Sequence, residues 1–275
     1  MKNNKIIESD IETIQKDYNQ RFGQNLSLEE FKTQYFPTFL LPTAVKRYEI
    51  LRKYIIGNKI LDAGCGTGWA DFLLASEGFK VTAIDLSDKS LEKARKIKDL
   101  LGFKTRFVKD DLEELSFKDN AFDSALSFDV LEHIPDLDKA LSEMRRVLKP
   151  KGMLVASFPN KYGVYCLVKD YFMDRFIWKI LGKDVKDIRT YHLNIQCLGW
   201  WLKKFRKNGF KPVCINNTEF ISPIIPKFAK KIFKGIISAD IALSKKLPKL
   251  IASQWVFVLQ NQKNNGAPHT KVCGL

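Results

Sequence analysis

The sequence predicts an α/β protein with an open, doubly wound sheet that is mostly parallel. Short β-type runs alternate along the chain with longer segments of helical periodicity, which is the pattern of βαβ units. The first run, residues 60–63, breaks into three glycines at alternate positions, Gly64, Gly66 and Gly68, before a helical pattern begins at Trp69. The 275 residues, 45% of them hydrophobic, suffice for one core of this kind with additions.

The elements follow in order along the chain. Strands are expected over residues 60–63, 79–85, 105–108, 121–127 and 152–158, with helices from 69 and over 88–101 and 137–148 between them. A helix over 198–207 and strands over 209–215 and 254–259 come next. Residues 8–54 predict two or three helices, including 43–54, so that 1–56 forms a helical N-terminal cap. Residues 261–275 are polar and without periodicity, and we expect a mobile tail.

The glycine turn lets a ligand approach the backbone closely, and the helix after it offers free N–H groups. A tight turn without a ligand is the alternative. Trp69 stands where a dinucleotide fingerprint needs its last glycine, and no Gly-Lys-Ser/Thr of a phosphate loop is present. Asp62, two residues before the first glycine, would repel phosphate and attract an ammonium or sulfonium group. This favours S-adenosylmethionine as the ligand.

Acids also follow the next two strands. Asp85 ends the second strand, where it can accept both hydroxyls of a ribose, because ligands of open α/β sheets lie outside the carboxyl ends of the strands. Asp111 follows the third strand, where an adenine amino group could be met. Asp110 and Asp111 are equally consistent with an N-cap of a helix over 112–115.

Six blocks of this sequence resemble the class I S-adenosylmethionine-dependent methyltransferases, most closely the branch of the ubiquinone- and menaquinone-biosynthesis enzymes. The blocks are residues 61–68, 84–87, 111–115, 122–125, 130–134 and 146–152, which stand in the family's order and spacing. The resemblance implies a Rossmann-like sheet of seven strands with the last one antiparallel, within a domain over 57–260 that carries insertions at 160–192 and 222–250.

By the same resemblance, the three glycines cradle the methionine part of S-adenosylmethionine. Asp85 would hold the ribose, and Asp111 with Leu112 would hold the adenine. Asp62, Leu86 and Ser127 complete the set of residues that we expect at the cofactor.

Positive charge is concentrated in the last part of the chain. Basic and acidic residues number nine and seven in 1–56, sixteen and eighteen in 57–158, and twenty-one and six in 159–275. The net charge of +15 therefore equals the excess of the last segment. Within it, residues 162–181 are rich in aromatic side chains and follow the fifth strand, where a lid over a substrate would be inserted.

Residues 223–250 interleave lysines with apolar side chains, and positions 228, 232, 236 and 243 fall close to one helical face. This predicts a basic amphipathic helix, which can lie on an anionic membrane surface. One alternative is an ordinary surface helix with a solvated lysine face. Contact with nucleic acid ranks last, because no known reader motif accompanies the charge.

The cysteines and the N-terminus bear on the compartment. Five scattered cysteines without a C-x-x-C pair argue for reduced thiols in a cytoplasm. The N-terminus lacks an apolar signal core, and no run approaches the length of a transmembrane helix. We expect a cytoplasmic protein, with peripheral contact to the inner membrane surface if the basic helix binds lipid. The oligomeric state stays open.

Methyl transfer needs a general base only if the nucleophile must lose a proton. Of the three histidines, His133 follows the fourth strand and His192 follows the aromatic segment, so both are candidate catalytic residues. His133 can also simply pack or cap the next helix. Asp129, Glu132 and His133 form D-x-x-E-H, to which His192 could add a fourth ligand for magnesium, manganese or iron. The alternative is a helix N-terminus whose acids complement the dipole.

The expected function is therefore S-adenosylmethionine-dependent methyl transfer, first of all to oxygen. The expected acceptor is an apolar or membrane-associated small molecule, such as a lipid, a quinone precursor or a lipid-linked saccharide. An RNA methyltransferase is one alternative, which steep salt dependence would reveal. A cofactor-binding module without turnover is the other, because a fold does not settle a function.

Overall fold

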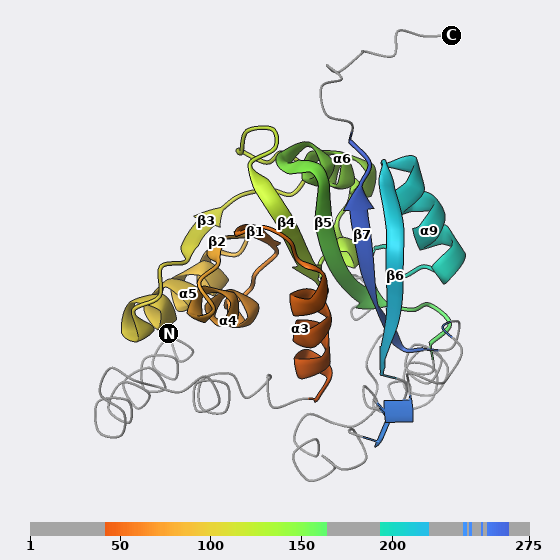
Figure 1. Ribbon diagram of the computed structural model, residues 1–275, viewed down its shortest axis with the longest axis horizontal. Helices are drawn as coiled ribbons and strands as arrows, with labels where there is room; N and C mark the ends of the chain where they lie inside the picture. Colours follow the sequence, from red (N-terminus) through yellow and green to blue (C-terminus); the bar gives the residue numbers. More distant parts are fainter. Residues whose placement is uncertain are drawn as a thin grey trace, which may run out of the picture.

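The computed structural model describes residues 42–163, 193–219, 239–240, 242–243, 249 and 252–263. Seven strands form one sheet in the order β3-β2-β1-β4-β5-β7-β6 (Figure 1). Their bounds are β1 Lys59–Ala63, β2 Lys80–Asp85, β3 Arg106–Lys109, β4 Phe122–Phe128, β5 Leu148–Pro159, β6 Phe210–Glu219 and β7 Gln254–Asn261. The first five strands are parallel, whereas β7 runs antiparallel to both β5 and β6. The predicted doubly wound, seven-stranded sheet with an antiparallel last strand is confirmed.

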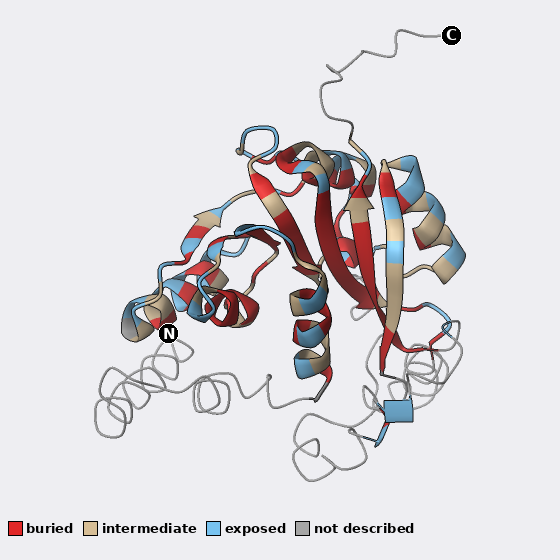
Figure 2. Ribbon diagram, viewed as in Figure 1, coloured by how far each residue is buried: buried red, intermediate tan, exposed pale blue. Residues whose placement is uncertain are grey.

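Helices cover both faces of this sheet (Figure 1). They are α3 Pro42–Tyr54, α4 Trp69–Ser76, α5 Asp88–Leu101, α6 Leu137–Val147 and α9 Leu198–Lys207, with a 3₁₀ turn η1 over Leu131–His133. Two apolar cores result, one with α3, α4 and α5 and the other with α6 and α9. Neighbouring residues of β1 enter different cores, Ile60 the first and Leu61 the second. Strands buried on both faces are typical of parallel sheets (Figure 2).

The strand order reverses between β1 and β4, which are neighbours in the sheet although β2 and β3 intervene in the sequence. Helices on opposite faces diverge at such a switch point, and a crevice opens outside the carboxyl ends of the strands. The topology therefore fixes the place where a ligand can bind before any side chain is considered.

Helix α3 confirms the helix expected over 43–54, and it packs across β5, β6 and β7. Its anchor is Glu77 at the end of α4, whose carboxylate accepts hydrogen bonds from Tyr48 and Arg52. The N-terminal part of the helix thereby reaches the carboxyl edge of the sheet.

Arg146 on α6 holds the loop between β3 and β4. Its guanidinium donates to the carbonyls of Leu115 and Phe117 at 2.8 and 2.7 Å. It also binds Glu143, which in turn accepts from the Leu115 N–H at 2.9 Å. Arg146 therefore fixes a loop that has no regular secondary structure, because each of its hydrogen bonds restricts the backbone conformation of that loop.

Several expectations fall wholly or partly outside the described residues. They are the first part of the N-terminal cap, most of the insertions 160–192 and 222–250, His192, and the tail beyond residue 263. The tail begins later than predicted, because Asn261 belongs to β7 and its amide donates to the carbonyls of Arg145, Leu148 and Lys149. No helix in the described part of the chain has the length and apolar character to cross a membrane.

Candidate functional site

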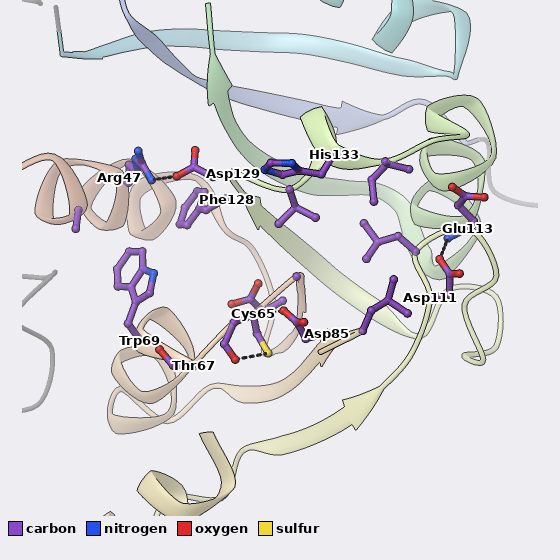
Figure 3. Close-up of a pocket in the computed structure, with 18 of the residues that line it drawn as sticks. Arg47, Cys65, Thr67, Trp69, Asp85, Asp111, Glu113, Phe128, Asp129 and His133 are labelled. Carbon is purple, nitrogen blue, oxygen red and sulfur yellow. Dashed lines mark hydrogen bonds and ion pairs between the residues drawn. The ribbon is translucent and has the colours of Figure 1, made fainter. Parts of the chain in front are cut away.

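A pocket of about 960 Å³ lies at the switch point, outside the carboxyl ends of β1, β2 and β4 (Figure 3). Acidic, apolar and aromatic side chains line it together. They are Thr43, Ala44, Arg47, Asp62, Gly64, Cys65, Gly66, Thr67, Trp69, Asp85, Leu86, Asp111, Leu112, Glu113, Phe128, Asp129, Val130, His133, Ile134 and Pro135.

The glycine turn forms one wall of the pocket. The N–H groups of Gly64 and Cys65 both donate to the Ile84 carbonyl at 2.9 Å, which ties the turn to β2. Gly64 and Gly66 have φ angles of 90° and 56°, in the left-handed region that favours glycine. A Cβ on Gly64 would lie 2.3 Å from a Val130 methyl carbon, whereas a Cβ on Gly66 would meet no atom within 4 Å. Gly66 therefore leaves an open cradle where a ligand can touch the backbone.

Asp85 lies beside this cradle. Its two carboxylate oxygens accept from the N–H groups of Gly66 at 2.9 Å and Ser87 at 2.8 Å. Each oxygen keeps a lone pair for a further donor, such as a ribose hydroxyl. Leu86, 56% exposed, lines the pocket next to it.

Asp111 and Leu112 line the far side. One oxygen of Asp111 accepts from the Glu113 N–H at 2.8 Å, and Leu112 is buried. The alternative of a helix N-cap is wrong, because residues 111–114 form a turn with an isolated bridge between Asp111 and Glu114. Asp110 instead accepts from the N–H and hydroxyl of Ser116.

Two residues expected at the cofactor are not among those that line the pocket. The Ser127 side chain is fully buried and donates to the Ala63 carbonyl at 3.0 Å. Gly68 is the N-cap of α4 with a φ of 82°, and a Cβ there would lie 2.9 Å from the Phe107 ring. Ser127 therefore supports the glycine turn from behind, and Gly68, the last glycine of the turn, allows the Phe107 ring to pack closely against it.

Sequence reasoning missed Arg47 and the pair of rings formed by Trp69 and Phe128. The Arg47 guanidinium donates to Asp129 at 2.6 Å (Figure 3) and also to Gln254. Trp69 and Phe128 stack with centroids 5.9 Å apart and planes at 17°. The helical pattern of 43–54 indicated a cap, but which of its residues faces the pocket depends on how the helix docks.

The residues of the D-x-x-E-H pattern do not gather as a metal centre. Asp129 binds Arg47 and Gln254, and Glu132 is 1% exposed with its carboxylate 4.0 Å from the His133 ring nitrogen. Burial, followed by the charge of Asp129, raises the pKa of Glu132 to about 8. Within the described residues, no group of three or more His, Cys, Asp or Glu could hold a metal ion. His133 does line the pocket.

Comparisons with known proteins agree with this geometry. Residues 61–156 match the family described as "Methyltransferase domain". A protein of Methanocaldococcus jannaschii, MJ0638, is 30% identical over 76% of this chain and 81% of its own length. The ubiquinone biosynthesis O-methyltransferase of Klebsiella pneumoniae is 29% identical over 53% of this chain. The 2-methyl-6-phytyl-1,4-hydroquinone methyltransferase of Synechocystis is 36% identical over 66% of it.

These two alignments span 60% and 55% of the Klebsiella and Synechocystis enzymes, less than two thirds of either. Among solved structures, an S-adenosylmethionine-dependent methyltransferase from Methanosarcina mazei superposes with a TM-score of 0.53 at 21% identity. That match covers 77% of this chain and 96% of the other. The glycine cradle, the acids at the ends of three strands and these relatives lead to one assignment: the chain belongs to the class I S-adenosylmethionine-dependent methyltransferases.

Proposed function

We propose that this methyltransferase methylates an oxygen atom of an apolar or membrane-associated small molecule, such as a lipid, a quinone precursor or a lipid-linked saccharide. The observation that carries the proposal is that two chemically different sets of side chains line the same pocket. One set is acidic and comprises Asp62, Asp85 and Asp111, whereas the other consists of stacked rings and aliphatic side chains, and His133 lines the pocket with them.

The acidic set suits the cofactor. S-adenosylmethionine carries two positively charged groups, a ribose diol and an adenine amino group, all of which carboxylates attract or accept from. Asp62 would meet the ammonium group, Asp85 the diol and Asp111 the adenine. The open backbone at Gly66 leaves room for the methionine chain. Arg47, which lines the pocket, offers a cation for the carboxylate of the methionine chain. It would bind this carboxylate while it also donates to Asp129.

The apolar set suits the acceptor. Trp69, Phe128, Val130 and Ile134 present a surface on which a ring or an acyl chain loses contact with water. The bound cofactor supplies an activated methyl group, so catalysis is largely the alignment of the acceptor oxygen with it. As the oxygen–carbon bond forms, the carbon–sulfur bond breaks and the acceptor hydroxyl loses its proton. His133, on the pocket wall, is the proposed base for this proton; His192 remains a second candidate outside the described residues.

The names of two relatives support this acceptor class. One acts in ubiquinone biosynthesis as an O-methyltransferase, and the other methylates a hydroquinone that carries a phytyl chain. The excess of basic residues in 159–275 favours action at an anionic membrane surface, where such acceptors reside. A metal-assisted reaction would need ligands beyond the described residues, with His192 as the first candidate.

The first experiment is a calorimetric titration with S-adenosylhomocysteine, with NAD as a control ligand. Asp85→Ala should weaken binding at least about tenfold, because the variant loses the acceptor for the ribose hydroxyls. Asp99→Ala is the matched control, since Asp99 lies on α5 and pairs with Lys98 outside the pocket. No binding to the wild type would contradict the proposed use of the cofactor.

The second experiment follows labelled methyl groups from S-adenosylmethionine into acceptors. Catechols and hydroquinones with short or polyprenyl side chains are offered in neutral and in anionic vesicles. Faster turnover of the long-chain acceptors, and more so on anionic vesicles, is expected. Turnover only on RNA oligonucleotides, with a steep salt dependence, would favour the RNA alternative. Firm cofactor binding without turnover on any acceptor would favour the interaction module.

A further inference from the structure

Asp71 is a buried acid that the proposed reaction leaves without a role. It lies in the first turn of α4, directly after the glycine turn, and is 0% exposed. Neither of its carboxyl oxygens accepts a hydrogen bond from any donor among the described residues. An acid in the first turn of a helix usually complements the dipole from the solvent side, but this one faces inward.

The burial of Asp71 determines its protonation. A carboxylate without donors in an apolar environment is strongly disfavoured, so the neutral form prevails. A neutral carboxyl has an O–H that needs an acceptor. The neighbouring group that acts on the titration of Asp71 is the carboxyl of Asp62 on β1, which is 4% exposed and lines the pocket. Asp62 is therefore the acceptor available to an O–H of Asp71.

The titration of the two acids agrees with this direction. Burial and the neighbouring charge of Asp62 raise the pKa of Asp71 well above its usual range. Burial raises the pKa of Asp62 to about 7, while its hydrogen bond with Asp71 acts in the opposite direction. The other titratable groups that face the pair are Asp85 on β2, whose charge raises the pKa of Asp62 further, and the Cys65 thiol, which burial keeps protonated.

We propose that Asp71 is a positioning residue for the cofactor: as a neutral acid it donates a hydrogen bond to Asp62, and so keeps Asp62 ionised and oriented for the ammonium group of S-adenosylmethionine. The inference rests on cofactor binding at this pocket. It gives the buried acid pair a function that neither acid has alone, because Asp62 without a donor would favour its neutral form.

A dependence of binding on pH follows. Since only ionised Asp62 attracts the ammonium group, affinity for S-adenosylhomocysteine should rise with pH up to about 7 and level off above it. Below that pH, binding should release protons, which calorimetry in two buffers with different ionisation enthalpies detects.

Two variants whose side chains have the same number and branching of heavy atoms as aspartate separate positioning from packing. Asp71→Asn keeps a donor for Asp62 and should bind S-adenosylhomocysteine within about threefold of wild type, with a similar pH profile. Asp71→Leu removes the donor. It should bind at least about tenfold more weakly at pH 7, with its profile displaced to higher pH. Thermal unfolding of both variants serves as the control for the fold.

Equal losses in the two variants, or wild-type binding by Asp71→Leu at pH 7, would overturn the proposal. Carbon-13 spectra of the aspartate carboxyls give a readout that needs neither variant nor cofactor. One aspartic acid should stay protonated in the wild type at pH values where exposed aspartates are fully ionised, and its absence would also overturn the proposal. This spectrum distinguishes a failure of the acid pair from a failure of cofactor binding, which the wild-type titration tests separately.

Discussion

Replacing Gly66 by alanine should weaken cofactor binding and leave the fold intact. The φ angle of Gly66 is 56°, so alanine must adopt a left-handed conformation that costs about 1–2 kcal/mol. No steric cost adds to this, because the new Cβ meets no atom within 4 Å. A domain with a typical free energy of unfolding of about 5–15 kcal/mol stays folded after such a loss.

The effect on the ligand is separate from this backbone cost. The open space at the new Cβ belongs to the pocket, beside the N–H that donates to Asp85. A methyl group there would occupy the volume that we propose for the methionine chain. We expect affinity for S-adenosylhomocysteine to fall at least about tenfold, or about 1.4 kcal/mol in binding free energy.

Gly102→Ala is the matched control. Gly102 ends α5 with a φ of 71°, and its Cβ would also meet no atom within 4 Å, but it does not line this pocket. Both variants should lose similar thermal stability, about 2–4 °C per kcal/mol, and only Gly66→Ala should lose affinity in calorimetry. Binding by Gly66→Ala within twofold of wild type would refute the cradle. An equal loss of affinity in both variants would instead show that the strained backbone, and not the filled pocket, weakens binding.

Three further predictions test other parts of the molecule. His133→Asn should lower kcat by about 10²–10⁴-fold in single-turnover assays with unchanged S-adenosylhomocysteine affinity, as expected for a lost base; an unchanged kcat would contradict that role. Arg146→Met should lower the free energy of unfolding in urea by about 2–3 kcal/mol, because two loop carbonyls and Glu143 lose a charged donor; a loss below 1 kcal/mol would show that water replaces it. Asp138 accepts from Asn208, Lys207 and Lys204, which holds its pKa well below the usual range. It therefore stabilises the fold above a pH of about 4, and this contribution is lost as the pH falls further; Asp138→Asn should cost about 1 kcal/mol at pH 7 and flatten that acid limb.

Most of the fold could be predicted because its signals are local. The alternation of apolar runs with helical periodicity identified every strand and α-helix from residue 42 to 159, with bounds off by a few residues, but not the 3₁₀ turn η1. The place of β7 between β5 and β6 depends on tertiary pairing and was not predicted; the resemblance to a family implied only that the last strand is antiparallel. The predicted N-cap at Asp110 and Asp111 failed because four residues are too few for a helix when the side chains can instead bond to the backbone of a turn.

The residues of the pocket could be predicted where their location follows from their place at the end of a strand. Asp62, Gly66, Asp85 and Asp111 reach the pocket because the carboxyl ends of parallel strands meet at one edge. Arg47 could not be assigned, because its direction depends on the docking of α3 through Glu77. Which residues contact a ligand and which support the turn from behind, as Ser127 does, likewise depends on packing.

Asp85 and Asp111, two of the acids that line the pocket, differ from several other acids of the domain in what holds them. Asp119, Asp123 and Asp138 pair with lysine or arginine side chains. Among the described residues, by contrast, no ion pair involves Asp85 or Asp111, which accept from backbone N–H groups instead.

A backbone donor orients a carboxylate without a mobile cation and without covering its remaining lone pairs. The negative charge therefore stays available for the hydroxyl and amino groups of a ligand. An ion pair at the same place would have to be broken first, so that part of the binding free energy would be lost. Among 31 acidic residues, the composition alone cannot show which ones are held in this way. The turn after each strand determines which acids accept hydrogen bonds from backbone N–H groups. The glycine turn and the acids therefore have to be considered as one site.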